Sequence, residues 1–102
     1  MNGETLQRKV VISAPDGLHL RPISAFAEAA KQFQSRVTVH KDGKAFDGKS
    51  PLDMMLLAAV QGTELDLEVD GPDARDALRS LVDLLVGLAV VEQTDPPPPP
   101  KG

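Results

Sequence analysis

The sequence contains no cysteine, tryptophan or tyrosine, and its only aromatic residues are three phenylalanines. The absence of cysteine excludes disulfide bridges, thiol catalysis and cysteine-ligated zinc or iron–sulfur sites, and it fits a protein of the reducing cytoplasm. Because aromatic residues are so few, the chain also lacks the usual platform on which unpaired bases stack. The formal net charge of -4 further argues against a nucleic-acid partner, since such binding needs clustered lysine and arginine.

Long hydrophobic runs are also missing from the sequence. The first residues, MNGETLQRKVVISAPDG, have neither the apolar stretch of a signal peptide nor any sign of a membrane span. We therefore expect a soluble cytoplasmic protein that does not insert into a membrane. The 102 residues, 41% of them apolar, suffice for one core, which we place in a domain over residues 1–91. Residues 92–102 contain the run DPPPPP and are predicted to form a disordered, solvated proline-rich tail.

Hydrophobic periodicity predicts an alternation of strands and amphipathic helices. Alternating apolar residues and turn signals predict strands over residues 6–12, 35–41, 44–47 and 63–70. Helical spacing predicts helices over residues 20–33 and 50–61, and a third from residue 74 with an apolar stripe that extends to Leu88. The order βαββαβα predicts an α+β open-faced sandwich, in which three helices cover one face of a four-stranded antiparallel sheet.

The stretch GLHLRP places a histidine at the predicted start of the first helix. The backbone amides of Leu20 and Arg21 would have no helical partner there, so they favour an anion beside His19. Arg21 adds a permanent charge that suits phosphate oxygens, Pro22 is compatible with the first turn, and Gly17 would allow close approach. A neutral imidazole is a good nucleophile towards phosphorus, so this stretch predicts a phosphoryl acceptor. The alternative is an ordinary exposed N-cap.

The second histidine, His40, has none of these surroundings. It is predicted to point outward from a strand into solvent, with no helix terminus or arginine arranged around it. Because no third ligand accompanies the two histidines, we expect no metal site, and the sequence gives no sign of another cofactor.

The second predicted helix is unusually apolar between Leu52 and Val60. We expect Met54 and Leu57 to enter the core, whereas the other apolar residues exceed what one buried face can hold. The predicted exposed patch for partner docking consists of Leu20, Leu52 and Met55. The alternative is a helix that is buried on all sides, which periodicity alone does not exclude in so short a run.

Three stretches together resemble a known family. APDGLHLRP, GKS at residues 48–50 and QGTEL at residues 61–65 are similar to the active-site, regulatory-serine and last-strand passages of HPr, the histidine-containing phosphocarrier family of the bacterial phosphoenolpyruvate-dependent sugar phosphotransferase system. The resemblance runs from about residue 6 to residue 88 without insertions.

This resemblance implies a phosphoryl carrier that is recycled by its partners and is not itself an enzyme. His19 would be phosphorylated on Nδ1 by enzyme I and would pass the group to IIA domains of sugar permeases. Arg21 would steady the phosphoryl group, while Gly17 and Pro22 would shape the loop. We expect such a carrier to act as a monomer.

Ser50 has two interpretations. As the N-cap of the second helix, followed by Pro51 at the first helical position and by Asp53 in capping-box position, it needs no regulatory role. In many relatives from Gram-positive bacteria, however, the matching serine is the target of an HPr kinase/phosphorylase. Pro51 and Asp53 depart from the pattern around that serine, and Glu28 makes the expected binding face less basic. The alternative function is accordingly a regulatory HPr-like protein, either in a nitrogen-related branch or controlled through Ser50.

Overall fold

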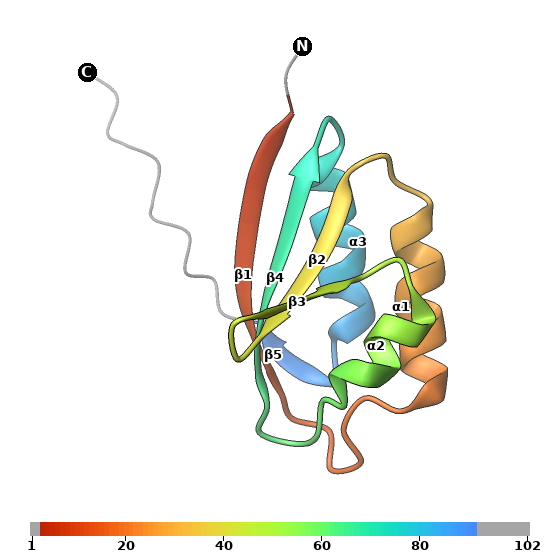
Figure 1. The fold of residues 1–102 in the computed structure, drawn as a ribbon, viewed down its shortest axis with the longest axis vertical. Coiled ribbons are helices and arrows are strands. Elements are labelled where there is room, and N and C mark those ends of the chain that lie inside the picture. Colours follow the sequence, from red (N-terminus) through yellow and green to blue (C-terminus); the bar gives the residue numbers. More distant parts are fainter. Residues whose placement is uncertain (1–2, 92–102) are drawn as a thin grey trace, which may run out of the picture.

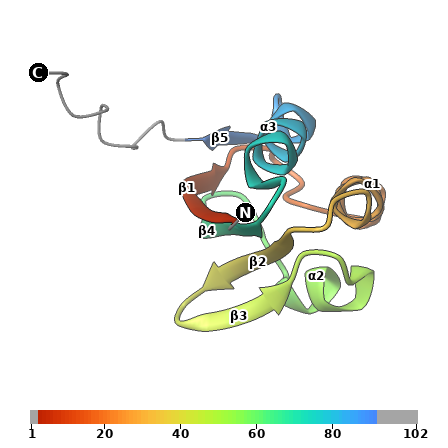
Figure 2. The same cartoon turned by 90° about the horizontal axis from the view of Figure 1, so that it is seen from above.

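The computed structural model describes residues 3–91 and contains one antiparallel sheet covered on one face by three helices (Figures 1 and 2). The strand order is β3-β2-β4-β1-β5. The elements in chain order are β1 (Glu4–Ile12), α1 (Leu20–Lys31), β2 (Arg36–Lys41), β3 (Lys44–Asp47), α2 (Pro51–Leu57), β4 (Glu64–Gly71), α3 (Ala74–Leu85) and β5 (Ala89–Val91). The predicted α+β architecture with three helices is confirmed, and the predicted number of strands is wrong. The predicted tail at 92–102 lies outside the described residues.

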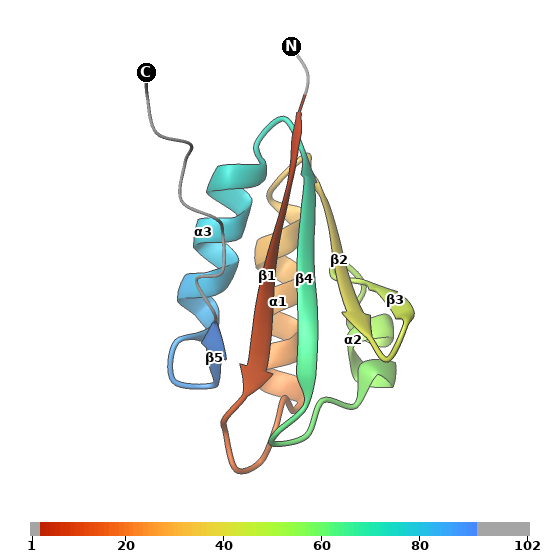
Figure 3. The same ribbon diagram turned by 90° about the vertical axis from the view of Figure 1, so that its left-hand side faces the viewer.

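The additional strand is β5, which pairs antiparallel with the end of β1 through Val10–Ile12 (Figure 3). The predicted helical stripe extends to Leu88, but α3 ends at Leu85 and the chain turns through Gly87, whose φ is +86°. The Leu88 carbonyl then accepts hydrogen bonds from the amides of Ser13 and Ala14. The edge of β1 provides hydrogen-bond partners for the backbone groups of this segment. Hydrophobic periodicity does not reveal that such an edge is available, so it does not predict the strand.

The core lies between the helices and the inner face of the sheet. The central strand β4 shows the predicted alternation, with Leu65, Leu67 and Val69 buried and the intervening acidic residues on the open face. Its neighbours β1 and β2 add inward residues, and the apolar stripes of α1 and α3 cover them. The fully or almost fully buried contributors include Val10, Ile12, Val37, Val39, Ile23, Phe26, Ala27, Ala30, Ala77, Leu78 and Leu81.

The helix α2 is shorter than predicted. It ends at Leu57, and Ala58 adopts the left-handed conformation with φ +51°. The predicted end at Gln61–Gly62 is therefore wrong. Gly62 instead lies in a turn where its amide donates to the Ile12 carbonyl over 2.7 Å. Tertiary hydrogen bonds thus draw residues after α2 towards the β1 end, which interrupts the helix before its apolar pattern ends.

A polar contact joins the end of α1 to the start of α3. The Asp73 carboxylate accepts hydrogen bonds from the Ser35 hydroxyl at 2.5 Å and from the amides of Ser35 and Gln34, both at 2.9 Å. These bonds to the ionised form, first of all the one from the Ser35 hydroxyl, lower the pKa of Asp73 below its usual value. Gly71 packs against Ser35, so the turn that carries Asp73 is held close to the loop after α1.

Candidate functional site

His19 is the N-cap of α1 and lies at an exposed end of the molecule. Its backbone is extended, with φ -104° and ψ -173°, and its carbonyl accepts the first helical hydrogen bond from the Ile23 amide over 3.1 Å. The imidazole makes no capping hydrogen bond, in contrast to many N-cap side chains. Both ring nitrogens of His19 are thus left without a partner among residues 3–91, and the ring is accessible to a second protein.

The first turn of α1 provides a positive environment next to this ring. The amides of Leu20 and Arg21 precede the first helical hydrogen bond and have no helical acceptor, while Pro22 has no amide to satisfy. No acidic residue occupies this turn. Arg21 is exposed and forms no hydrogen bond or ion pair within the described part of the chain. The turn can therefore bind the oxygens of an anion that reaches His19.

The loop before His19 is anchored to the chain after α2. Gly17 has φ +67°, and a Cβ atom at this position would lie 2.5 Å from the Ala59 carbonyl oxygen. The neighbouring Leu18 amide donates a hydrogen bond to that same oxygen over 2.8 Å. The close approach that requires glycine here is the contact with Ala59 and Val60. Sequence reasoning assigned Gly17 to this loop but gave no sign of the contact.

A groove beside His19 separates α1 from the end of α3. His19, Arg21, Pro22 and Ala25 line one side, and Leu84 and Leu88 line the other. Leu88 was predicted only as a member of a helical stripe, Leu84 was not singled out, and the sequence has no signal that places either leucine near the histidine. Leu84 reaches the groove from the last turn of α3, and the turn after α3 brings Leu88 there.

The predicted docking patch is exposed as expected. Met54 and Leu57 are buried, whereas Leu52 is 66% exposed, Met55 52% and Leu20 62%. The alternative of a helix buried on all sides is therefore wrong. Leu56 and Val60 are also exposed and extend the apolar surface beyond the predicted residues. Because α1 packs against α2, the surface borders the helix whose N-cap is His19.

Ser50 is the N-cap of α2, as predicted, with its hydroxyl oxygen accepting a hydrogen bond from the Asp53 amide at 3.1 Å. The reciprocal half of the predicted capping box is absent. The Ser50 amide donates to the Asp47 carbonyl, and the Asp53 carboxylate instead accepts from the Asp47 amide at 3.0 Å. Asp53 therefore fastens α2 to the end of β3, a contact that a local capping pattern does not reveal.

His40 is half-buried on the open face of the sheet and is not the solvated histidine that the sequence predicted. Its Nε2 lies 2.7 Å from the Glu68 carboxylate of the neighbouring strand. The pairing of β2 with β4 brings the two residues together, and this register is a tertiary feature. Among residues 3–91, no group of three histidine, aspartate or glutamate side chains is arranged to hold a metal ion. No helix in this range is long and apolar enough to cross a membrane.

The chain is similar to known proteins over most of its length. Residues 6–86 match the family model described as the PTS HPr component phosphorylation site. The phosphocarrier protein HPr of Neisseria meningitidis is 42% identical over 82 residues, which cover 80% of this chain and 92% of that protein. The HPr-like protein Crh of Bacillus subtilis is 40% identical over 76 residues, or 74% of this chain and 89% of Crh. A solved mycoplasma histidine-containing phosphocarrier protein superimposes with a TM-score of 0.77 and 30% identity, covering 80% of this chain and 93% of that one.

An open-faced sandwich with an accessible histidine at the start of its first helix defines a phosphocarrier domain, a non-enzymatic component of a phosphoryl relay. More specifically, the chain belongs to the HPr family of the phosphotransferase system.

Proposed function

We propose that this protein accepts a phosphoryl group on His19 from phosphorylated enzyme I and passes it to IIA domains of sugar permeases. The observation that carries the proposal is the unpaired, exposed imidazole beside two amides without helical acceptors and an arginine without a partner in the described chain. The family assignment supports it. We further propose that the carrier acts as a monomer in the cytoplasm.

In this mechanism a neutral ring nitrogen of His19, Nδ1 by family resemblance, forms a new bond to phosphorus. The bond between phosphorus and the donor atom breaks at the same time, and its electron pair remains on the donor. Charge on the three phosphoryl oxygens would be stabilised by the amides of Leu20 and Arg21 and by the Arg21 guanidinium. Gly17 and Pro22 would fix the backbone on either side, so the ring and the anion site would keep their relative position.

Phosphorylation in a defined mixture tests this function. The protein is incubated with phosphoenolpyruvate, magnesium and enzyme I from the source organism, and the product is examined for one acid-labile, base-stable phosphoryl group. We expect the group to be lost in His19→Ala and retained in His40→Ala, the matched loss of the other histidine. Labelling that persists in His19→Ala would contradict the assignment of the acceptor.

A second candidate function is regulatory, and the similarity to Crh favours it. Ser50 would then be phosphorylated by an HPr kinase/phosphorylase. The hydroxyl already lies at the start of α2, where a phosphate is compatible with the helix dipole, and the added charge would repel an acidic partner. Incubation with that kinase and ATP should modify the wild type and leave Ser50→Ala unmodified. Modification of both proteins would contradict a regulatory role for Ser50.

A further inference from the structure

Three of the five arginines in the chain line one hollow between β1 and α3, which we call the arginine hollow. Arg8 comes from β1, in the part of the strand before Val10–Ile12, where β5 pairs (Figure 3). Arg75 and Arg79 come from α3, which packs against β1. The hollow has a volume of about 390 Å³, and none of its lining residues also lines the groove beside His19. It is therefore a separate feature of the molecule.

Arg8 occupies a position of β1 that faces the helices. Its cross-strand partner on β4 is Leu67, which is buried on the inner face of the sheet. Cross-strand partners share a face, so Arg8 points to the same side and is partly buried there. Its Nη1 donates a hydrogen bond to the Gln7 carbonyl at 2.8 Å. The inner face of an antiparallel sheet normally carries apolar residues, so packing alone does not explain an arginine at this position.

The two arginines of α3 lie on one face of the helix, because they are four residues apart. Like charges at this spacing repel each other, so the arrangement does not stabilise the helix. Glu4 holds the first of them, with Arg75 Nε donating to Oε1 at 2.6 Å and Nη2 donating to Oε2 at 3.4 Å. The Nη1 group of Arg75 has no partner among residues 3–91. The ion pair thus orients the guanidinium and leaves one donor group available.

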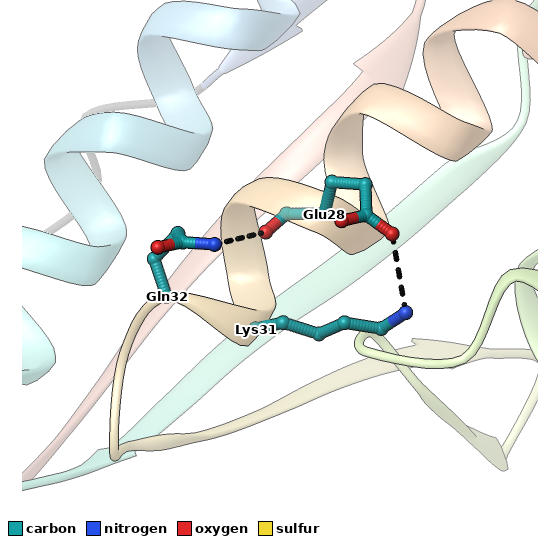
Figure 4. A network of polar contacts seen from close by, with 3 residues as sticks. All are labelled: Glu28, Lys31 and Gln32. Atoms are coloured by element: carbon teal, nitrogen blue, oxygen red, sulfur yellow. Dashed lines mark hydrogen bonds and ion pairs between the residues drawn. The ribbon is translucent and has the colours of Figure 1, made fainter.

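Arg79 lacks the pairing that another helical cation of this protein has. At the end of α1, the Lys31 ammonium lies 3.2 Å from the carboxylate of Glu28, three residues earlier (Figure 4). Asp76 and Asp83 lie three residues before and four residues after Arg79. Arg79 is nevertheless exposed and forms no ion pair or hydrogen bond within the described part of the chain. All the donors of its guanidinium are therefore available to a ligand.

We propose that the arginine hollow binds a small phosphate monoester. A phosphate monoester carries about two negative charges and three strong acceptor oxygens, which suit several guanidinium groups better than a single carboxylate does. Leu6, Leu78 and Val82 also line the hollow and provide apolar contacts for the carbon body of the ligand. Even with Glu4 and Asp83 counted, arginines outnumber carboxylates around the hollow, in a chain whose net charge is -4. The inference does not depend on the proposed carrier function.

An NMR titration of the isotope-labelled, full-length protein with phenyl phosphate tests this proposal residue by residue. Inorganic phosphate is the matched probe without a carbon body, and both titrations are made in about 50 mM NaCl to limit screening. We expect the amides around Arg8 and Arg79 to shift, with a Kd for phenyl phosphate below about 1 mM. The Kd for inorganic phosphate should be at least about fivefold higher, because it lacks the apolar contacts.

The anion site proposed at His19 also attracts phosphate, so the titration is repeated in Arg21→Ala. The shifts around Arg79 should persist in that variant. Shifts confined to the surroundings of His19 in the wild type, or no saturation around Arg79 below about 10 mM phenyl phosphate, would overturn the proposal.

A pair of arginine variants separates a site from general attraction of anions. Arg79→Gln should raise the Kd for phenyl phosphate by about tenfold, since it removes charge-assisted hydrogen bonds. Arg36→Gln removes an exposed arginine from β2 and changes the net charge equally, yet should leave the Kd within about twofold of the wild type. Arg79→Gln should also keep the wild-type Tm, because the side chain has no partner among residues 3–91. An equal rise of the Kd in both variants, or no rise in Arg79→Gln, would contradict the proposed site.

Discussion

Gly17 and Ala59 set the distance between the histidine loop and the end of α2, because a side chain at residue 17 would lie 2.5 Å from the Ala59 carbonyl oxygen. Gly43 provides a control, since its φ is +80° but a Cβ atom there would meet nothing within 4 Å. We expect Gly43→Ala to cost about 1–2 kcal/mol from the left-handed backbone alone. Gly17→Ala should cost about 1–3 kcal/mol more, because the loop must move away from Ala59.

Urea unfolding measures the two free energies, and the rate of His19 phosphorylation is compared under conditions in which both variants are folded. The rate should fall in Gly17→Ala and remain normal in Gly43→Ala. Equal stability and equal rates in the two variants would show that the contact does not position His19.

Ala58 ends α2 in the left-handed conformation, with φ +51°, although it is not glycine. Replacement by glycine removes the steric cost at this position, so Ala58→Gly should stabilise the protein by about 0.5–1 kcal/mol. Ala25→Gly within α1 is the control of opposite sign and should destabilise by about 0.5–1 kcal/mol. Thermal unfolding of both variants checks the prediction, which fails if Ala58→Gly is as destabilising as Ala25→Gly.

The contact between Ser35 and Asp73 predicts a dependence of stability on acid pH. Since the pKa of Asp73 is lower in the folded protein than in the unfolded chain, its contribution is complete above the unfolded value of about 3.9 and is lost as the pH falls through the folded value. Relative to the wild type, Asp73→Asn should therefore lower the free energy of unfolding most near neutral pH. It should also flatten the acid side of the stability profile.

The measurement is the urea midpoint at several pH values between about pH 7 and about pH 2. Asp76→Asn removes one carboxylate from the first turn of α3, at an exposed position with no hydrogen bond to other described residues, and so controls for the change in net charge. If both variants show the same pH profile as the wild type, the Asp73 contact does not contribute as proposed.

Arg21 should affect phosphoryl transfer without affecting stability. It has no intramolecular partner among residues 3–91, so Arg21→Ala should leave the Tm unchanged. Loss of the guanidinium should slow transfer by about 100-fold, and Arg21→Lys should recover only part of that loss because it supplies charge without the fork of donors. Arg79→Ala on α3 removes the same charge elsewhere and should transfer normally. A normal rate in Arg21→Ala would remove this residue from the mechanism.

Two truncations distinguish β5 from the tail. Removal of residues 93–102 is expected to leave both stability and transfer intact. Removal of everything after Leu88 eliminates the pairing of β5 with Val10–Ile12 and uncovers apolar surface, so it should cost about 1–3 kcal/mol. Chemical unfolding of both truncated proteins tests this difference. Equal stability of the two would mean that β5 contributes nothing to the fold.

Local sequence determined most of the framework of this protein. The alternation in β4, the apolar stripe of α1, the turn at Asp42–Gly43 and the N-cap at Ser50 each depend on neighbouring residues, so they could be predicted before any contact between elements was known. The same is true of His19 at the start of a helix with Arg21 beside it. The order of residues alone places that imidazole next to amides without acceptors.

Only the tertiary structure decided which distant groups meet. The edge of β1 recruits Ala89–Val91 as a fifth strand, the Ala59 carbonyl anchors the loop before His19, and the pairing of β2 with β4 brings Glu68 to His40. These contacts form because buried backbone groups and half-buried polar side chains need hydrogen-bond partners, and their partners lie far away in sequence. A periodic pattern shows that a segment has an apolar face, but the packing of the other elements determines where that segment ends and what it contacts.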